Sequence, residues 1–251
     1  MEEGKFNRLV EPNEASLKYL KEEIIKKNCD FAVGYDCDAD RIEILLSDGT
    51  LVSGNQILAL ITEEILIHSE PQEKTVVVND ATSYLVKEIV DRYNGIWKEV
   101  EVGEINVVDK MIEFDSNVGG EGSNGGVIIS PSKCRDGILT FLVLLKLINE
   151  KNKSLKELID ELPKYYYLKE KVKLKEDFIL LRDKIKKYYL DNGFQILETG
   201  DKTGGMKAIK DNSWIWFRQS KTEDKALRII ADSKIKDISE KLIDEAKGLL
   251  E

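Results

Sequence analysis

Three acidic residues at alternate positions form a group that could hold a metal ion. Asp36, Asp38 and Asp40 follow a short apolar run and are succeeded directly by Arg41. Three carboxylates held in a tight turn repel one another unless a cation lies between them, and oxygen ligands of this kind suit Mg²⁺. The strict spacing therefore predicts a Mg²⁺ site here in preference to a solvated acidic turn.

Two other acidic motifs fit this turn less well. An EF-hand needs glycine at its sixth position and glutamate at its twelfth, where this sequence has Arg41 and Ser47. A haloacid-dehalogenase-type phosphatase also places Asp-x-Asp after a strand, but Thr or Val should follow where Ala39, Asp40 and Arg41 stand. Neither class accounts for the turn.

A glycine-rich stretch at residues 119–126 is the second group with chemical potential. Glu121, Ser123 and Asn124 offer a carboxylate, a hydroxyl and an amide among glycines that let the backbone approach a ligand. Such a set suits the hydroxyls of a sugar better than an apolar ligand. A glycine-rich hairpin without a ligand would have a similar composition, so this loop alone is a weak indication.

The third group follows the apolar run 214–217. Arg218 supplies a bidentate fork, and the hydroxyls of Ser220 and Thr222, with loop amides, complete a cradle for an oxyanion. Lys221 adds positive charge to it. An ordinary polar hairpin is the alternative reading of this segment.

The elements around these groups predict an α/β protein with an α+β C-terminal part. Residues 1–70 are typical of helix, strand, turn, strand and helix, and residues 75–160 alternate strands with helices, which favours a mostly parallel sheet. After Pro163 the pattern is a helix, four short strands near 194–198, 205–209, 214–218 and 226–232, and a final amphipathic helix. We expect three units: 1–70, 71–163 and 164–251.

Two residues of the middle segment are assigned to the ends of one helix. Asp80 is the predicted cap of a helix that carries Leu85, Ile89 and Val90, and Gly95 is its predicted C′ residue.

Composition narrows the class of protein. The 251 residues carry 38 Lys and Arg against 47 Asp and Glu, a formal net charge of −9, which argues against nucleic acid as a partner. With three cysteines and one histidine, His68, no Cys/His zinc set can be assembled, and His68 is expected to be structural. No secretory signal or membrane-length apolar run is seen, so we expect a cytoplasmic protein with no membrane partner.

Taken together and in this order, the three groups resemble those of the α-D-phosphohexomutases, which include phosphoglucomutase, phosphomannomutase and phosphoglucosamine mutase. Residues 36–41 are similar to the metal loop of that family's second domain, and 121–126 to the sugar-binding loop of its third. Residues 218–223 resemble the phosphate-binding loop of its fourth domain, with Arg228 on the next strand. Residues 102–111 also resemble a third-domain segment.

The resemblance implies phosphohexomutase-like mixed α/β domains and an activity. A phosphoryl group would move between the 1 and 6 positions of a hexose phosphate through a phosphoserine and a bisphosphate intermediate. The implied roles are as follows: Mg²⁺ binding by Asp36, Asp38 and Asp40; assistance at the transferring group by Arg41; sugar binding by Glu121, Ser123 and Asn124; and phosphate binding by Arg218, Ser220, Lys221, Thr222 and Arg228.

The resemblance also implies an absence. Family members are nearly twice as long, and their first domain carries the phosphoserine, whereas Ser16 is the first serine here and lies in a predicted helix. Residues 8–13 look like a mid-domain Pro-Glu-Pro-Asn stretch, so the chain corresponds to a C-terminal part. We expect it to be inactive alone, with a separately encoded N-terminal half as its partner. A truncated chain and a decayed gene remain alternatives.

Two departures from the family pattern affect the assignments. Cys37 stands where metal loops usually have glycine, and an inserted residue in the sugar loop leaves the role of Asn124 and the choice of hexose open. The alternative function is a non-catalytic sugar-phosphate- or partner-binding protein derived from the family, and a metal-dependent phosphatase ranks third.

Overall fold

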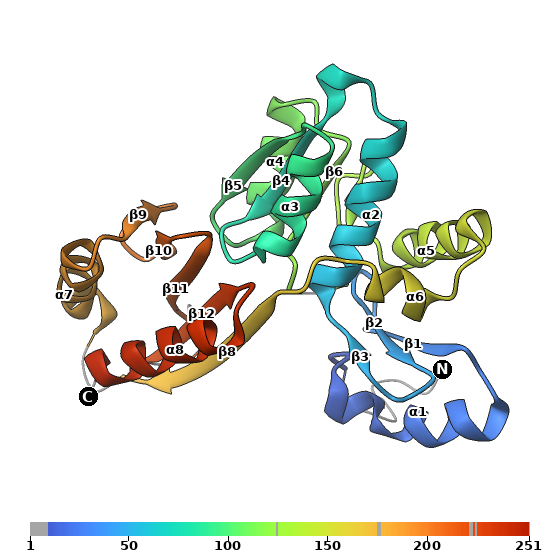
Figure 1. The fold of residues 1–251 in the computed structure, drawn as a ribbon, viewed down its shortest axis with the longest axis horizontal. Coiled ribbons are helices and arrows are strands. Elements are labelled where there is room, and N and C mark those ends of the chain that lie inside the picture. Colours follow the sequence, from blue (N-terminus) through green and yellow to red (C-terminus); the bar gives the residue numbers. More distant parts are fainter. Residues whose placement is uncertain (1–9, 124, 175–176, 221–222, 224, 251) are drawn as a thin grey trace.

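The computed structural model describes residues 10–250 except 124, 175–176, 221–222 and 224 (Figure 1). The three motifs belong to three different sheets, and each lies at the connection between two neighbouring strands of its sheet. Asn124, Lys221 and Thr222 lie outside the described residues.

The first unit is a three-stranded antiparallel sheet in the order β1-β2-β3. Its elements are α1 (Glu14–Lys27), β1 (Phe31–Tyr35), β2 (Ile42–Leu46), β3 (Leu51–Val52) and α2 (Gly54–His68). Helix α1 begins after Asn13, whose side chain accepts a hydrogen bond from the backbone N–H of Ser16 at 3.0 Å. The predicted helix, strands and turn of this segment are confirmed.

The middle unit alternates strands and helices, as predicted. Its elements are η1 (Pro71–Glu73, a 3-10 helix), β4 (Thr75–Asn79), α3 (Tyr84–Arg92), β5 (Ile96–Val100), α4 (Glu104–Glu113), β6 (Val118–Gly120), β7 (Ile128–Ile129), α5 (Gly137–Lys151) and α6 (Leu155–Asp160). Strand β4 pairs in parallel with β5 and β6, while β7 closes the sheet antiparallel to β6. The sheet order is β5-β4-β6-β7.

The predicted cap of α3 is wrong. The helix begins after Ser83, whose hydroxyl accepts the backbone N–H of Leu85 at 3.1 Å. Asp80 instead is 1% exposed and accepts a hydrogen bond from Thr199 of the C-terminal unit. Its carboxylate is therefore used between units rather than at a helix end.

The predicted C′ residue of α3 is displaced by one position. Asn94 has the left-handed backbone conformation, with φ of 55°, that ends the helix. Gly95 follows it and donates its N–H to the carbonyl of Val90 at 2.9 Å. Glycine is still needed there, because a Cβ at residue 95 would lie 2.8 Å from the carbonyl oxygen of Lys74.

The C-terminal unit is an antiparallel sheet in the order β8-β12-β11-β10-β9. Its elements are β8 (Tyr166–Lys173), α7 (Phe178–Asp191), β9 (Gln195–Glu198), β10 (Met206–Lys210), β11 (Ser213–Gln219), β12 (Ala226–Ser233) and α8 (Lys236–Leu250). The α+β prediction is confirmed, including its four strands. Strand β8 was not predicted.

The first two units share a hydrophobic core, whereas the C-terminal unit has a core of its own. One core contains side chains from β2, α2, β4, α3 and α5, and a separate core fills the C-terminal unit. Helix α5 packs beside the first sheet, where the rings of Phe31 and Phe141 meet edge to face (Figure 1). The predicted three-way division stays a prediction. Among the described residues, no helix has the length and apolarity needed to cross a membrane.

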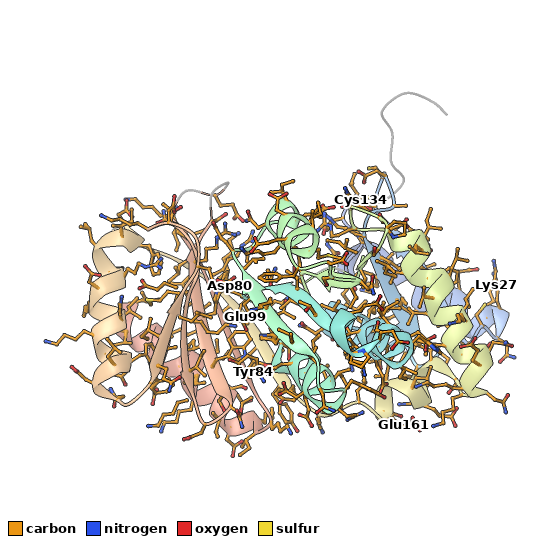
Figure 2. The ribbon with its side chains drawn as sticks, turned by 90° about the horizontal axis from the view of Figure 1, so that it is seen from above. Lys27, Asp80, Tyr84, Glu99, Cys134 and Glu161 are labelled. Atoms are coloured by element: carbon orange, nitrogen blue, oxygen red, sulfur yellow. The ribbon has the colours of Figure 1, made fainter. Side chains whose placement is uncertain are left out.

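Buried aromatic and charged side chains join the middle unit to the C-terminal unit. Trp214 and Trp216 of β11 pack with Ala81 and Tyr84 of the middle unit. Figure 2 shows Asp80, Tyr84 and Glu99 along the boundary between the two units. This interface holds β11 against the middle unit.

The buried carboxylate of Asp232 is expected to make stability depend on pH. It accepts the hydroxyl of Ser83 at 2.9 Å and the N–H of Tyr84 at 2.7 Å, and burial raises its pKa to about 7. Between its ordinary pKa and this value the folded state holds a proton that the unfolded state has lost. The free energy of unfolding should therefore fall as the pH rises from about 4 to about 7, and stay lower above it.

Urea unfolding of the wild type and Asp232→Asn across this pH range measures the effect. The asparagine variant should show a shallower decline, though not a flat one, because burial also raises the pKa of Glu43 to about 7. Parallel curves for the two proteins would show that Asp232 does not titrate in this way.

Candidate functional site

The turn between β1 and β2 brings the three predicted metal ligands together. Asp36, Asp38 and Asp40 can each present one carboxylate oxygen so that all three oxygens lie within 4.8 Å of one another. The antiparallel pairing of β1 and β2 folds the connecting residues back on themselves, and Ala39 at φ of 58° tightens the turn. The local chain conformation thus produces a compact group of oxygen ligands.

Arg41 lies against the same acids. Its Nε is 3.5 Å from Oδ2 of Asp36 and 3.6 Å from Oδ1 of Asp40, and its backbone N–H donates to Oδ1 of Asp36 at 3.2 Å. Burial and the neighbouring acids raise the pKa of Asp36. Burial would also raise the pKa of Asp40, but a hydrogen bond with Asp36 and the nearby Arg135 outweigh it and hold that pKa below its ordinary value.

Two glycines of the 119–126 loop pack directly against the acidic turn at residues 36–41, which is called the metal turn below. A Cβ at Gly125 would lie 1.8 Å from the carbonyl oxygen of Ile42, and one at Gly126 would lie 1.9 Å from that of Asp40. Only residues without a side chain permit this approach. The sequence suggested that glycine admits a ligand here, whereas the backbone of the metal turn fills the space beside these two.

Glu121 is the most firmly held residue of the loop. Its Oε1 accepts the N–H of Gly103 at 3.0 Å and the side-chain amide of Asn79 at 3.2 Å, and its Oε2 accepts Nη1 of Arg135 at 3.0 Å. It is 6% exposed, whereas Ser123 is half-buried. The loop therefore presents a fixed carboxylate next to a more accessible hydroxyl.

Arg135 was not singled out from the sequence. It follows Cys134 without any motif spacing, and its side chain pairs with Asp40, Glu104 and Glu121. Its local sequence offers one signal, the position next to Asp136, which is the N-cap of α5. The contact itself joins residues 95 positions apart.

The predicted phosphate-binding residues lie at the end of β11 and on β12. Arg218 and Arg228 are direct cross-strand neighbours, so their side chains leave the same face of the sheet. Nη2 of Arg218 contacts Oε1 of Glu101 at 2.8 Å, while Arg228 is exposed. Ser220 accepts the backbone N–H of Glu223 at 3.2 Å through its hydroxyl.

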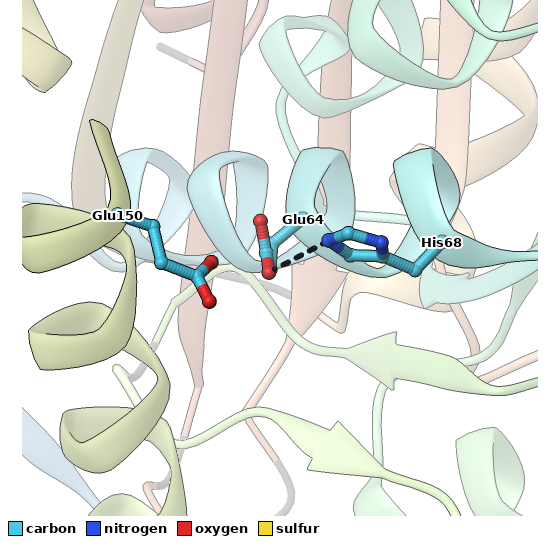
Figure 3. A group of neighbouring side chains, drawn as sticks. All are labelled: Glu64, His68 and Glu150. Atoms are coloured by element: carbon cyan, nitrogen blue, oxygen red, sulfur yellow. Dashed lines mark ion pairs between the residues drawn. The ribbon is translucent and has the colours of Figure 1, made fainter.

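A second group of possible metal ligands lies on α2 and α5. Figure 3 shows Glu150 extending from α5 toward Glu64 and His68 of α2. Glu64 is buried and already contacts Nε2 of His68 at 3.2 Å and Nζ of Lys146 at 2.7 Å. Since an ammonium group compensates this carboxylate, the cluster is explained as an ion-pair network, in keeping with the structural role expected for His68.

Comparison with known proteins places this geometry in a family. Residues 53–166 match the family description "Phosphoglucomutase/phosphomannomutase, alpha/beta/alpha domain III", a range that begins before the expected boundary near residue 71. The chain is 32% identical over 245 residues to a phosphoglucomutase/phosphomannomutase of Thermococcus kodakarensis, covering 97% of this chain and 52% of that protein. The chain belongs to the phosphoglucomutase/phosphomannomutase family.

Further members show the same partial coverage. A phosphoglucosamine/phosphogalactosamine mutase of Sulfurisphaera tokodaii is 30% identical, over 97% of this chain and 53% of its own length. The fold matches a family protein of Burkholderia thailandensis with a TM-score of 0.80 at 17% identity, over 95% of this chain and 50% of that one. The chain thus spans about half the length of the phosphohexomutases it matches.

Proposed function

We propose that the chain supplies the metal-, sugar- and phosphate-binding part of a phosphohexomutase, which moves a phosphoryl group between the 1 and 6 positions of a hexose phosphate. One observation carries the proposal: a continuous line of contacts joins the three loops. Arg218 contacts Glu101, and two residues later the N–H of Gly103 binds Glu121. Glu121 then shares Arg135 with Asp40.

The acidic turn fits Mg²⁺ by its donor set. Asp36, Asp38 and Asp40 offer hard oxygen ligands, and the described cluster contains no histidine or thiolate that would favour zinc. Bound there, the ion supplies positive charge that stabilises a transferring phosphoryl group. An N-acetylphosphoglucosamine mutase of Aspergillus fumigatus, with a TM-score of 0.63 to this chain, is described in complex with GlcNAc-6P and magnesium.

The other residues bind and orient the substrate in this proposal. Arg41, beside the acids, donates to oxygens of the transferring phosphoryl group. Glu121 and Ser123 hold sugar hydroxyls, with Asn124 as a further candidate, and Arg218, Ser220, Lys221, Thr222 and Arg228 bind the phosphate that is not transferred. The serine that carries the phosphoryl group is proposed to come from a second polypeptide, equivalent to the half of the relatives that this chain does not match.

An activity and binding assay tests the proposal. The 251-residue chain, given glucose 1-phosphate, a glucose 1,6-bisphosphate primer and Mg²⁺, should give no turnover, and activity should appear when the other half of the Thermococcus kodakarensis relative is added. Calorimetry should show that the chain alone binds a hexose phosphate, at least about tenfold more weakly in Arg218→Gln, since a charge-assisted bidentate contact is lost.

Arg92→Gln is the matched control, because the half-exposed side chain of Arg92 pairs with Glu63 of α2 and belongs to none of the three loops. Robust turnover by the chain alone would show that no second half is needed. Failure to bind any hexose phosphate would contradict the proposal as a whole, and tight binding without restored activity would favour the non-catalytic alternative.

A further inference from the structure

The guanidinium of Arg135 connects two loops that the proposed function treats as separate sites. Its Nη2 binds a carboxylate oxygen of Asp40 in the metal turn, and its Nη1 binds Oε2 of Glu121 in the sugar loop at 3.0 Å. The side chain of Arg135 is 9% exposed, so these contacts are shielded from solvent. One cation is thus shared between a proposed metal ligand and a proposed sugar ligand.

Glu104 also holds Arg135, at both its backbone and its side chain. Its Oε1 accepts the backbone N–H of Arg135 at 2.8 Å, and its Oε2 lies 3.3 Å from Nε of the same residue. Because both the backbone and the root of the guanidinium are fixed, the two outer nitrogens have little freedom to follow a moving partner.

The backbones of the same segments are also packed together. Gly137, the first residue of α5, donates its N–H to the carbonyl of Ala39 at 3.0 Å. A Cβ at Gly126 would meet both the carbonyl of Asp40 and the Cβ of Arg135, the latter at 3.3 Å. A shift of the metal turn therefore displaces the loop that carries Glu121.

We propose that Arg135 is a positioning residue that links metal binding and sugar binding thermodynamically. A metal ion that binds Asp40 weakens the ion pair between that carboxylate and Nη2. The positive charge of the fixed guanidinium then acts more strongly on Glu121, which Nη1 binds. By reciprocity, a sugar hydroxyl bound to Glu121 must change the affinity of the metal site by the same factor. This inference rests on the proposed function of both loops.

Calorimetry with Mg²⁺, in the absence and presence of saturating glucose 6-phosphate, measures the link without any turnover. In the wild type we expect glucose 6-phosphate to change the Kd for Mg²⁺ by at least about fivefold, the lower end of typical coupling between sites. In Arg135→Gln the ratio of the two Kd values should lie within about twofold of unity. Arg135→Lys should fail to restore it, because an ammonium lacks the fork that spans two carboxylates.

Glu121→Gln supplies a second measurement that needs no sugar. In the wild-type background it should change the Kd for Mg²⁺, although Glu121 is not one of the proposed ligands, and in Arg135→Gln the same substitution should change it at least about threefold less. Arg92→Gln should behave as the wild type in both experiments, and melting temperatures show which variants are folded.

The outcomes separate this inference from the proposed function. If the wild type binds neither Mg²⁺ nor glucose 6-phosphate, the proposed function fails first. If both bind but independently, or if Arg135→Gln or Arg135→Lys keeps the wild-type ratio, Arg135 does not link the sites.

Discussion

Replacing Asp36 with asparagine is expected to weaken Mg²⁺ binding by about 100-fold. Its side chain is 7% exposed, and it is one of three acids whose oxygens lie within 4.8 Å of one another. Removing one unit charge about 4 Å from a cation forfeits several kcal/mol at an intermediate dielectric constant, part of which the retained amide oxygen recovers. Calorimetric titration with Mg²⁺ measures the change.

Asp48→Asn is the matched control for this prediction. Asp48 is an exposed acid in the turn between β2 and β3, where its carboxylate accepts the N–H of Thr50 at 2.9 Å. Its replacement should leave the Kd for Mg²⁺ within about twofold of the wild type, as expected for a distant and screened charge. Equal losses in both variants would mean that Mg²⁺ responds to net charge and has no site at the acidic turn.

Replacing Lys207 with methionine is expected to destabilise the protein by about 3–5 kcal/mol, the usual result of removing one partner of a buried ion pair. Its Nζ contacts Oε1 of Glu99 at 2.9 Å, and their side chains are 0% and 9% exposed. The ammonium also lies 4.7 Å from the ring centroid of Trp214 and 5.4 Å from that of Tyr84. The substitution leaves the Glu99 carboxylate between two units without its cationic partner, with the indole N–H of Trp97 at 2.9 Å as its remaining donor among the described contacts.

Urea unfolding measures the loss, with Lys210→Met as control. Lys210 lies on the same strand but is exposed, so its replacement should change the free energy of unfolding by less than about 0.5 kcal/mol. Adding Glu99→Gln to Lys207→Met should recover part of the lost stability, because the unpaired charge is then removed. If the double variant is as unstable as the sum of the single variants, the two side chains act independently.

The features predicted correctly from the sequence are those whose determinants are close together in the chain. Asn13 and Ser16 at the start of α1 are three residues apart, and the three acids that converge in one turn alternate within five positions, so a short segment contains the information; metal binding by these acids stays a prediction. The contacts that organise the site are of another kind. Asp40 and Arg135 are 95 positions apart, and Asp80 meets Thr199 across 119, so no local pattern could reveal them.

The unpredicted strand β8 has a related cause. Its central residues alternate between Leu168, Glu170 and Val172 on one side and lysines on the other, but charged residues in this number lower strand propensity. Pairing along eight residues of β12 supplies the stability that the local sequence lacks. Tertiary contacts therefore decided the structure of this segment.

The close approach of Gly125 and Gly126 to the metal turn limits how the proposed sugar loop can be varied. A library that varies the whole loop would place side chains where the carbonyls of Ile42 and Asp40 lie, and would select mainly for variants that still fold. Ser123 is part of the same loop and already carries a side chain, which is half-buried. Substitutions that test the proposed sugar binding should start at Ser123, with the two glycines left unchanged as part of the scaffold.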